Sequence, residues 1–137
     1  LKMQNTLSIL KDKNVLVTGA SGGLGRCIAH EFAKHDCNLY LTGRDENNLK
    51  SLTKEIQSNK NLFYKTANLE DVDQIKELSK DALQKLKNVD ILVNCAGVFQ
   101  LKSIDNIKLE DYNNIFNVNV RAPIPSMSRI YGRDGTQ

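Results

Sequence analysis

The sequence predicts an α/β fold with a parallel sheet, and three observations lead to this expectation. Short apolar runs rich in β-branched and aromatic residues alternate with longer segments in which apolar residues recur at three- and four-residue intervals. Turn-forming residues separate these segments, and several glycines directly follow the first apolar run. Strands that alternate with helices of this length form βαβ units with right-handed crossovers. We therefore expect one doubly wound parallel sheet.

The apolar pattern places strands and helices in turn along the chain. We expect the strands at residues 15–17, 38–42, 62–66 and 91–93. We expect the helices at residues 26–35, from 45–47 onward, at 72–86 and from about 109–111 onward. The helix at 72–86 has the clearest pattern, because Val72, Ile75, Leu78, Ala82 and Leu86 share one face and acidic residues lie near its start.

The other helices also have an apolar face. In the first helix, Leu24, Ile28 and Phe32 form the expected stripe, with Ala29 and Ala33 beside it. The second helix presents Leu49, Leu52 and Ile56, and the last presents Tyr112, Ile115 and Phe116. Residues 1–12 have no strong period and are expected to lead into the first strand.

The composition limits the classes of function. With 137 residues, 40% of them hydrophobic and 26% charged, the chain is long enough for one compact soluble domain. The net charge of +3 is small and the cations are scattered among acids, so no nucleic-acid partner is expected. No run approaches the ~18 apolar residues of a membrane span, and no signal peptide is recognised. We expect a cytoplasmic protein that binds neither nucleic acid nor a membrane.

The cysteines and histidines do not form a recognisable metal or disulfide pattern. Cys27, Cys37 and Cys95 are odd in number and lack Cys-x-x-Cys spacing, which suits a reducing compartment. Each is expected to be a small buried hydrophobic residue. His30 and His35 flank the apolar stripe of the first helix and are expected on its surface, because no ligand spacing accompanies them.

The first strand leads straight into a glycine-rich turn at Thr18–Gly25, which is followed by a helix. Gly19 allows a sharp turn out of the strand, since glycine accepts a positive φ. A missing side chain at Gly23 would let a pyrophosphate approach the backbone, and Gly25 would let the helix pack close to the strand. The helix start favours an anion, and the turn is not a P-loop because no Gly-Lys-Ser/Thr follows. The pattern predicts dinucleotide binding, and a glycine-rich turn without a ligand is the alternative.

Similar signals occur after the other strands. Gly43–Arg44 follows the second strand, Asn68–Leu69 the third and Asn94–Gly97 the fourth, while Asn119 lies in an Asn-Val-Asn-Val run on the last helix. Ligands of open parallel sheets bind at this carboxyl edge. Together with the glycine-rich turn, the pattern resembles the short-chain dehydrogenase/reductase family over residues 13–134.

The resemblance implies a Rossmann-type NAD(P)-binding domain and assigns roles to particular residues. The cofactor-binding residues that it implies are Thr18, Gly19, Ser21, Gly22, Gly23, Leu24, Gly25, Gly43, Arg44, Asn68, Leu69, Asn94, Ala96 and Gly97. Asn68 and Leu69 would lie beside the adenine, although the family more often has Asp where Asn68 stands. Asn119 matches the helix asparagine that orders a water molecule in the catalytic proton relay, and it is the one catalytic residue implied here.

The end of the second strand bears on the choice of cofactor. NAD enzymes of this kind usually place an acid there to bind the ribose 2′-hydroxyl, whereas an NADP site needs a cation for the 2′-phosphate. Gly43 stands in the acidic slot and Arg44 follows, which favours NADP(H) over NAD(H). Asp45 leaves NAD(H) open, because a one-residue shift would put its carboxylate in that slot. Gly22 stands where many NADP-preferring relatives have a second basic residue.

The catalytic pair of the family is absent from these 137 residues. The family's chemistry needs a Tyr, a Lys four residues later and a Ser. The residues four positions after Tyr40, Tyr64, Tyr112 and Tyr131 are Arg44, Asn68, Phe116 and Gly135.

We expect residues 1–137 to be a single domain truncated at its C-terminal end, about the first half to two thirds of it. Residues 121–134 would continue the family's helix despite Pro123 and Pro125. A genuinely short product is the alternative.

The resemblance implies hydride transfer between NADP(H) and a carbonyl or alcohol. The similarity is closest to the beta-ketoacyl carrier-protein reductases, so we expect a small-molecule or carrier-bound carbonyl substrate and a homo-oligomer when full length. A non-catalytic nucleotide-binding module is the alternative. Extended epimerase-type relatives fit the spacing of Gly19, Gly22 and Gly25, but not Asn94–Gly97 or Asn119. An incomplete sheet leaves an edge uncovered, so we expect the isolated chain to be poorly stable and prone to aggregate.

Overall fold

The computed structural model describes residues 9–98, 102–121 and 123 of the chain. Its centre is a four-stranded parallel sheet with the strand order β3-β2-β1-β4. The strands are β1 (Asn14–Thr18), β2 (Asn38–Gly43), β3 (Leu62–Thr66) and β4 (Ile91–Asn94). Val17 of β1 lies beside both Leu41 of β2 and Val93 of β4, so the carboxyl ends of these strands meet at one edge. The parallel sheet predicted from the sequence is confirmed.

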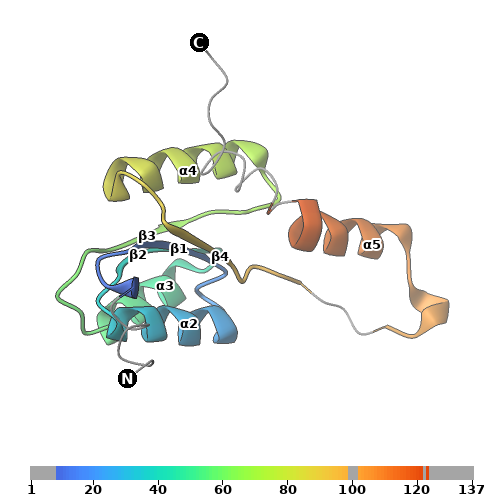
Figure 1. The fold of residues 1–137 in the computed structure, drawn as a ribbon. Coiled ribbons are helices and arrows are strands. Elements are labelled where there is room, and N and C mark those ends of the chain that lie inside the picture. Colours follow the sequence, from blue (N-terminus) through green and yellow to red (C-terminus); the bar gives the residue numbers. More distant parts are fainter. Residues whose placement is uncertain (1–8, 99–101, 122, 124–137) are drawn as a thin grey trace, which may run out of the picture.

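Helices cover both faces of this sheet (Figure 1). They are α2 (Gly23–Lys34), α3 (Glu46–Glu55), α4 (Val72–Leu86) and α5 (Leu109–Phe116). A 3₁₀ turn, η1 (Ile104–Asn106), precedes α5, and a π-helical turn, η2 (Asn117–Arg121), follows it. Helices α2 and α3 pack on one face and α4 packs on the other, which confirms the doubly wound arrangement. Helix α2 begins at Gly23 rather than at Arg26 as predicted, because the glycines form its first turn.

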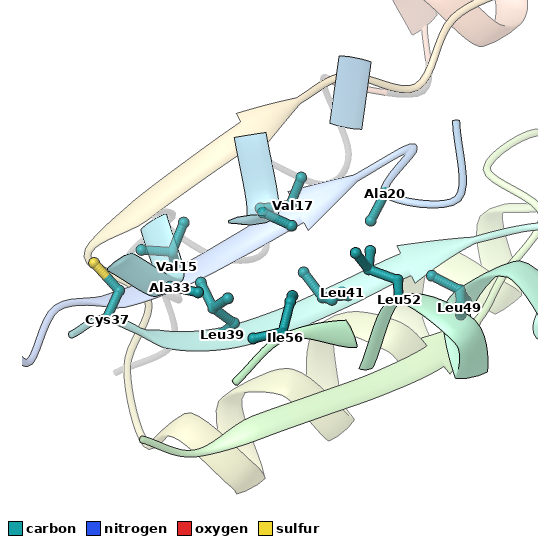
Figure 2. Close-up of a cluster of buried hydrophobic side chains, with 11 residues drawn as sticks. Val15, Val17, Ala20, Ala33, Cys37, Leu39, Leu41, Leu49, Leu52 and Ile56 are labelled. Carbon is teal, nitrogen blue, oxygen red and sulfur yellow. The ribbon is translucent and has the colours of Figure 1, made fainter. Parts of the chain in front are cut away.

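The larger hydrophobic cluster lies between the sheet and helices α2 and α3 (Figure 2). Its fully buried members include Val15, Val17, Ala29, Leu39, Leu41, Leu49 and Leu52. Ala29 and Ala33 are the α2 residues buried there, together with Gly25. Small residues on this line allow α2 to lie close to the sheet, so the glycine-rich turn at its start is held tightly against the end of β1.

Three burials predicted for α2 and α4 are wrong. Leu24 is 69% exposed and Val72 is 46% exposed, and Cys27 is also exposed. Helix α2 buries the line through Gly25, Ala29 and Ala33, so Leu24 and Cys27, one and two positions away from Gly25, turn toward solvent. Val72 is the first residue of α4, whose buried face starts only at Ile75.

Helix α4 is anchored to the opposite face by a buried tyrosine. Tyr40 of β2 is fully buried, and its hydroxyl donates a hydrogen bond to Asp81 of α4. Lys85 lies 3.1 Å from the Asp81 carboxylate and 5.9 Å from the centre of the Tyr40 ring. Burial, together with the neighbouring carboxylate, raises the pKa of Tyr40, so this phenol stays neutral. Tyr40 therefore stabilises the fold.

Helix α5 follows β4 and contributes little to either cluster. Tyr112 and Phe116 are 55% and 46% exposed and stack on each other with ring centres 5.4 Å apart. The apolar face predicted for this helix is thus largely in solvent. The predicted entry at residues 1–8 and the predicted continuation at 124–134 lie outside the described residues. Among the described helices, none combines the length and apolar character required to cross a bilayer.

Candidate functional site

A cleft of about 160 Å³ lies at the carboxyl edge of the sheet, where the loops after all four strands meet. The predicted cofactor residues that line it are Gly19, Ser21, Gly22, Gly43, Arg44, Asn68, Leu69, Ala96 and Gly97. Ala67, Glu70, Cys95, Val98 and Val118 also line it, and sequence reasoning did not assign them to the site. Arg44 is the one cation and Glu70 the one acid among the described lining residues.

Gly19 is needed both for its conformation and for its small size. Its φ is +65°, in the left-handed region that glycine adopts at least cost. A Cβ at this position would lie 2.5 Å from the amide nitrogen of Ala96 and 2.6 Å from the carbonyl carbon of Cys95. The turn after β1 therefore touches the loop after β4, and this contact forms the floor of the cleft.

Gly25 and Gly23 differ in their surroundings. A Cβ on Gly25 would overlap the carbonyl oxygen of Gly19, so the helix packs against the turn as the sequence predicted. A Cβ on Gly23 would have no described atom within 4 Å. The space beside Gly23 is therefore open, and it suits the close approach of a ligand to the backbone.

The start of α2 is not capped by a side chain. Gly22 occupies the N-cap position, and the first turn contains no acid. In contrast, Asp45 caps α3 and Asp71 caps α4 through their carboxylates. The first N–H groups of α2 thus have no intrahelical or side-chain acceptor among the described residues. With the helix dipole, they favour an anionic group.

Thr18 connects β1 to the end of β4 and the loop that follows it, beneath the cleft. Its hydroxyl accepts a hydrogen bond from the amide of Ala96 at 3.3 Å and donates to the carbonyl of Val93 at 3.4 Å. Thr18 is 1% exposed and is not among the lining residues. Asn94 is exposed at the end of β4 and also lies outside the described lining. Gly23, Leu24 and Gly25 are likewise outside it.

Asn119 fixes the loop after β4 from the other side. Its Oδ1 accepts from the amide of Val98 and its Nδ2 donates to the carbonyl of Val98, both at 2.8 Å. A Cβ on Gly97 would lie 3.2 Å from Oδ1 of Asn119. Asn119 of η2 thus contacts the segment that lines the cleft, and both the oxygen and the nitrogen of its side-chain amide bind Val98.

The acids that follow Arg44 are engaged within α3. The Asp45 carboxylate accepts from the amide of Asn48 at 2.9 Å as the helix cap. Glu46 pairs with Lys50 at 2.8 Å. Arg44 itself is exposed and lines the cleft. Arg44 therefore lines the site while the neighbouring carboxylates bind other groups.

A short network shapes the wall formed by the loop after β3. Oδ1 of Asn68 accepts from the amide of Glu70 at 3.1 Å, and the amide of Asn68 donates to Oε1 of Gln74 at 2.8 Å. Nε2 of Gln74 donates in turn to Asp71 at 3.1 Å. Sequence reasoning missed Gln74, although Asp71-x-x-Gln74 resembles a capping box at the start of a helix.

The side chains of Cys95, His30 and His35 make none of the hydrogen bonds described above for the cleft. Burial raises the pKa of the Cys95 thiol, so it lines the cleft as a neutral group. His30 lies 3.6 Å from Glu55, and His35 lies 3.4 Å from Glu31. Both histidines belong to the side of the molecule formed by α2 and α3.

A parallel α/β sheet with a glycine-rich turn at its carboxyl edge defines the Rossmann-type class of nucleotide-binding folds. The family model of the short chain dehydrogenases matches residues 13–131, so the chain belongs to this family. The chain is 34% identical over 124 residues to an uncharacterized oxidoreductase of Staphylococcus saprophyticus, covering 88% of this chain and 53% of that protein.

Two further relatives have more specific names. The NADPH-dependent pterin aldehyde reductase of Arabidopsis thaliana is 33% identical, covering 83% of this chain and 48% of its own length. The 3-oxoacyl-[acyl-carrier-protein] reductase FabG of Thermotoga maritima is 34% identical, covering 82% of this chain and 46% of its own length. The chain thus spans about half the length of the curated relatives it matches.

Solved structures agree with this assignment. A dehydrogenase/reductase from Sinorhizobium meliloti has a TM-score of 0.85 at 25% identity, covering 93% of this chain and 52% of its own. A blue fluorescent protein from a metagenomic library, in complex with NADPH, has a TM-score of 0.81 at 29% identity, with 88% and 51% coverage. These solved structures therefore share the fold of this chain, and the named relatives are oxidoreductases or reductases.

Proposed function

We propose that the protein to which this chain belongs transfers a hydride between NADP(H) and a carbonyl or alcohol substrate. The observation that carries the proposal is the cleft at the carboxyl edge of the sheet, with Arg44 facing it and Gly43 in place of an acid. The name of the Arabidopsis relative and the NADPH complex of the metagenomic protein support this choice of cofactor. Because the chain spans about half of its relatives, the activity of the whole protein is part of the proposal.

The residues of this chain fit the pyrophosphate of such a cofactor. The uncapped start of α2 offers N–H groups, and the open space beside Gly23 admits a phosphate against the backbone. Ser21 and Gly22, which precede this helix start, line the cleft. Gly25 keeps the helix close to Gly19, which holds these N–H groups in place.

The adenine end fits the opposite side of the cleft. Arg44 would bind the ribose 2′-phosphate, since a guanidinium is suited to phosphate oxygens. Asp45 is occupied as the cap of α3, so its carboxylate is directed to Asn48 rather than to a ribose. Asn68 and Leu69 would lie beside the base, on the wall that Gln74 holds. These contacts favour NADP(H) over NAD(H).

The nicotinamide end would lie along Asn94, Ala96 and Gly97. Reduced nicotinamide supplies the hydride, and this segment orients the ring. Thr18 and Asn119 hold the segment from two sides and keep its backbone in one conformation. Asn119 uses one N–H of its amide on Val98 and keeps the other for an ordered water molecule.

The proposed function also includes a substrate class, a localisation and an oligomeric state. The carrier-protein reductase of Thermotoga maritima supports a small-molecule or carrier-bound carbonyl substrate. We infer a cytoplasmic homo-oligomer as the full-length form. The catalytic Tyr-x-x-x-Lys pair would come from the coding sequence that adjoins these 137 residues, and reading that sequence tests this point directly.

Replacement of Arg44 by Asp in the full-length protein tests the choice of cofactor. We expect the Kd for NADPH, measured by fluorescence titration, to rise about tenfold or more, because a charge-assisted contact is lost and a repulsion is added. The Kd for NADH should change little. Lys54→Asp, which makes the same charge change at an exposed site on α3, is the control. An unchanged Kd or KM for NADPH in Arg44→Asp contradicts the assignment.

A further inference from the structure

Gly43 is a glycine because of space and not because of backbone conformation. Gly19 is the described glycine with a positive φ, and Gly43 continues the extended strand β2. A Cβ on Gly43 would overlap Oγ of Ser21 and would lie 3.0 Å from Cβ and 3.2 Å from the backbone nitrogen of Ser21. The Ser21 side chain therefore occupies the space in which any side chain at position 43 would begin.

The backbone at this point is held from both sides. The amide of Ala20 donates to the carbonyl of Thr42 at 2.9 Å, which ties the turn before Ser21 to the end of β2. The amide of Ala67, directly after β3, donates to the carbonyl of Gly43 at 3.0 Å, which ties Gly43 to the end of β3. Gly43 is buried. A side chain at position 43 therefore requires the Ser21 hydroxyl to rotate away, and its Cβ would still lie in tight contact with Cβ and the backbone nitrogen of Ser21.

We propose that Ser21 and Gly43 act as one specificity element, which blocks the position where a carboxylate would reach the ribose 2′-hydroxyl. The inference rests on the proposed function, because it concerns how the cleft discriminates the two nicotinamide cofactors. Arg44 supplies the attraction for a 2′-phosphate, and the packing of Ser21 on Gly43 excludes the competing acid. Specificity commonly combines an attractive contact with the exclusion of an alternative. The preference for NADP(H) is thus reversed only when positions 21 and 43 change together.

The test compares Ser21→Gly, Gly43→Asp and the double variant with the wild type, in the full-length protein. Two measurements are made: the unfolding temperature without ligand, and the Kd for 2′,5′-ADP and for 5′-AMP by calorimetry. These probes carry the adenosine end with and without the 2′-phosphate, so they need no catalysis. Gly43→Ala, which adds a Cβ without a charge, keeps the packing part measurable if Gly43→Asp does not fold.

We expect Gly43→Asp and Gly43→Ala to lower the unfolding temperature by about 3 °C or more, because overpacking is destabilising. Adding Ser21→Gly should recover most of this loss. The double variant Ser21→Gly/Gly43→Asp should shift the ratio of the two Kd values by about tenfold or more toward 5′-AMP, because the new carboxylate repels a 2′-phosphate. Gly43→Asp alone should weaken both probes instead of reversing the preference.

Two results overturn the inference. The first is that, when Ser21→Gly and Gly43→Ala are combined in one further double variant, its unfolding temperature falls by the sum of the two single losses. The second is that Gly43→Asp alone binds 5′-AMP more tightly than 2′,5′-ADP. If the wild type binds neither probe, the proposed function fails at the cofactor. If the wild type prefers 2′,5′-ADP while the variants act additively, the proposed function stands and the coupling of Ser21 with Gly43 is wrong.

Discussion

Polar side chains around the cleft bind backbone groups of the neighbouring loops. Thr18 and Asn119 hold the loop after β4, Asn68 closes the turn after β3, and Asp45 caps α3. Each such hydrogen bond contributes roughly 1 kcal/mol to stability. Their larger effect is to fix the shape of the cleft before a ligand arrives, and a fixed site loses less conformational entropy on binding. Arg44 then provides its positive charge at a preformed edge.

Gln74 offers a test of this preorganisation at a single residue. In Gln74→Leu the amide of Asn68 loses its acceptor, and the cap residue Asp71 loses a donor. We expect the Kd of the full-length protein for 5′-AMP to rise about threefold to tenfold, with an unfolding temperature within a few degrees of the wild type. Gln84→Leu on the same helix, also exposed, is the matched control. Equal Kd values for the two variants contradict a positioning role for Gln74.

The residues that could be predicted from the sequence are those whose constraint is local. Gly19 and Gly25 follow from the turn between a strand and a helix, and the structure shows both in tight contact. Glu70 and Val118 also line the cleft, but their place there depends on how distant segments pack. The contact of Ser21 with Gly43 joins the turn after β1 to the end of β2, so no spacing rule indicates it.

At the scale of elements, the start of α2 combines two roles in one turn of helix. Gly25 packs against Gly19 inside the protein, while Gly23 has open space beside it. One glycine therefore serves the fold and the other serves the ligand. The sequence predicted this division from the general mechanics of such turns. It also predicted the buried faces of α3 and α4, but it misplaced Leu24 and Val72 at helix starts.

Replacing each of the two glycines by alanine separates these roles. Gly25→Ala should lower the free energy of unfolding by about 1–3 kcal/mol, because its Cβ overlaps the carbonyl of Gly19. Gly23→Ala should leave it within about 1 kcal/mol of the wild type, since alanine favours a helix and meets no described atom. The Kd for NADPH should nevertheless rise in Gly23→Ala. Denaturant titration and fluorescence binding measure the two effects, and a large stability loss in Gly23→Ala would contradict the assignment.

At the scale of the whole molecule, the described part is a sheet with well-formed faces and an incomplete periphery. The clusters on both faces contain fully buried residues such as Val15, Tyr40 and Leu49. In contrast, β4 pairs with β1 alone among the described strands, and α5 has no buried residue. The parallel topology could be predicted because each βαβ unit is encoded locally. The segments that cover β4 and α5 could not be predicted, because their packing depends on contacts outside these βαβ units.

These uncovered parts lead to a prediction about the isolated 137-residue chain. Its strand edge at β4 and the exposed Leu109, Tyr112 and Phe116 offer backbone and apolar surface to other molecules. We predict a broad unfolding transition at low temperature and association that increases with concentration. Circular dichroism during heating, combined with sedimentation velocity at several concentrations, measures both properties, and the full-length protein is the control. A sharp, cooperative transition of a monomeric 137-residue chain contradicts the prediction, because it would mean that these segments need no further cover.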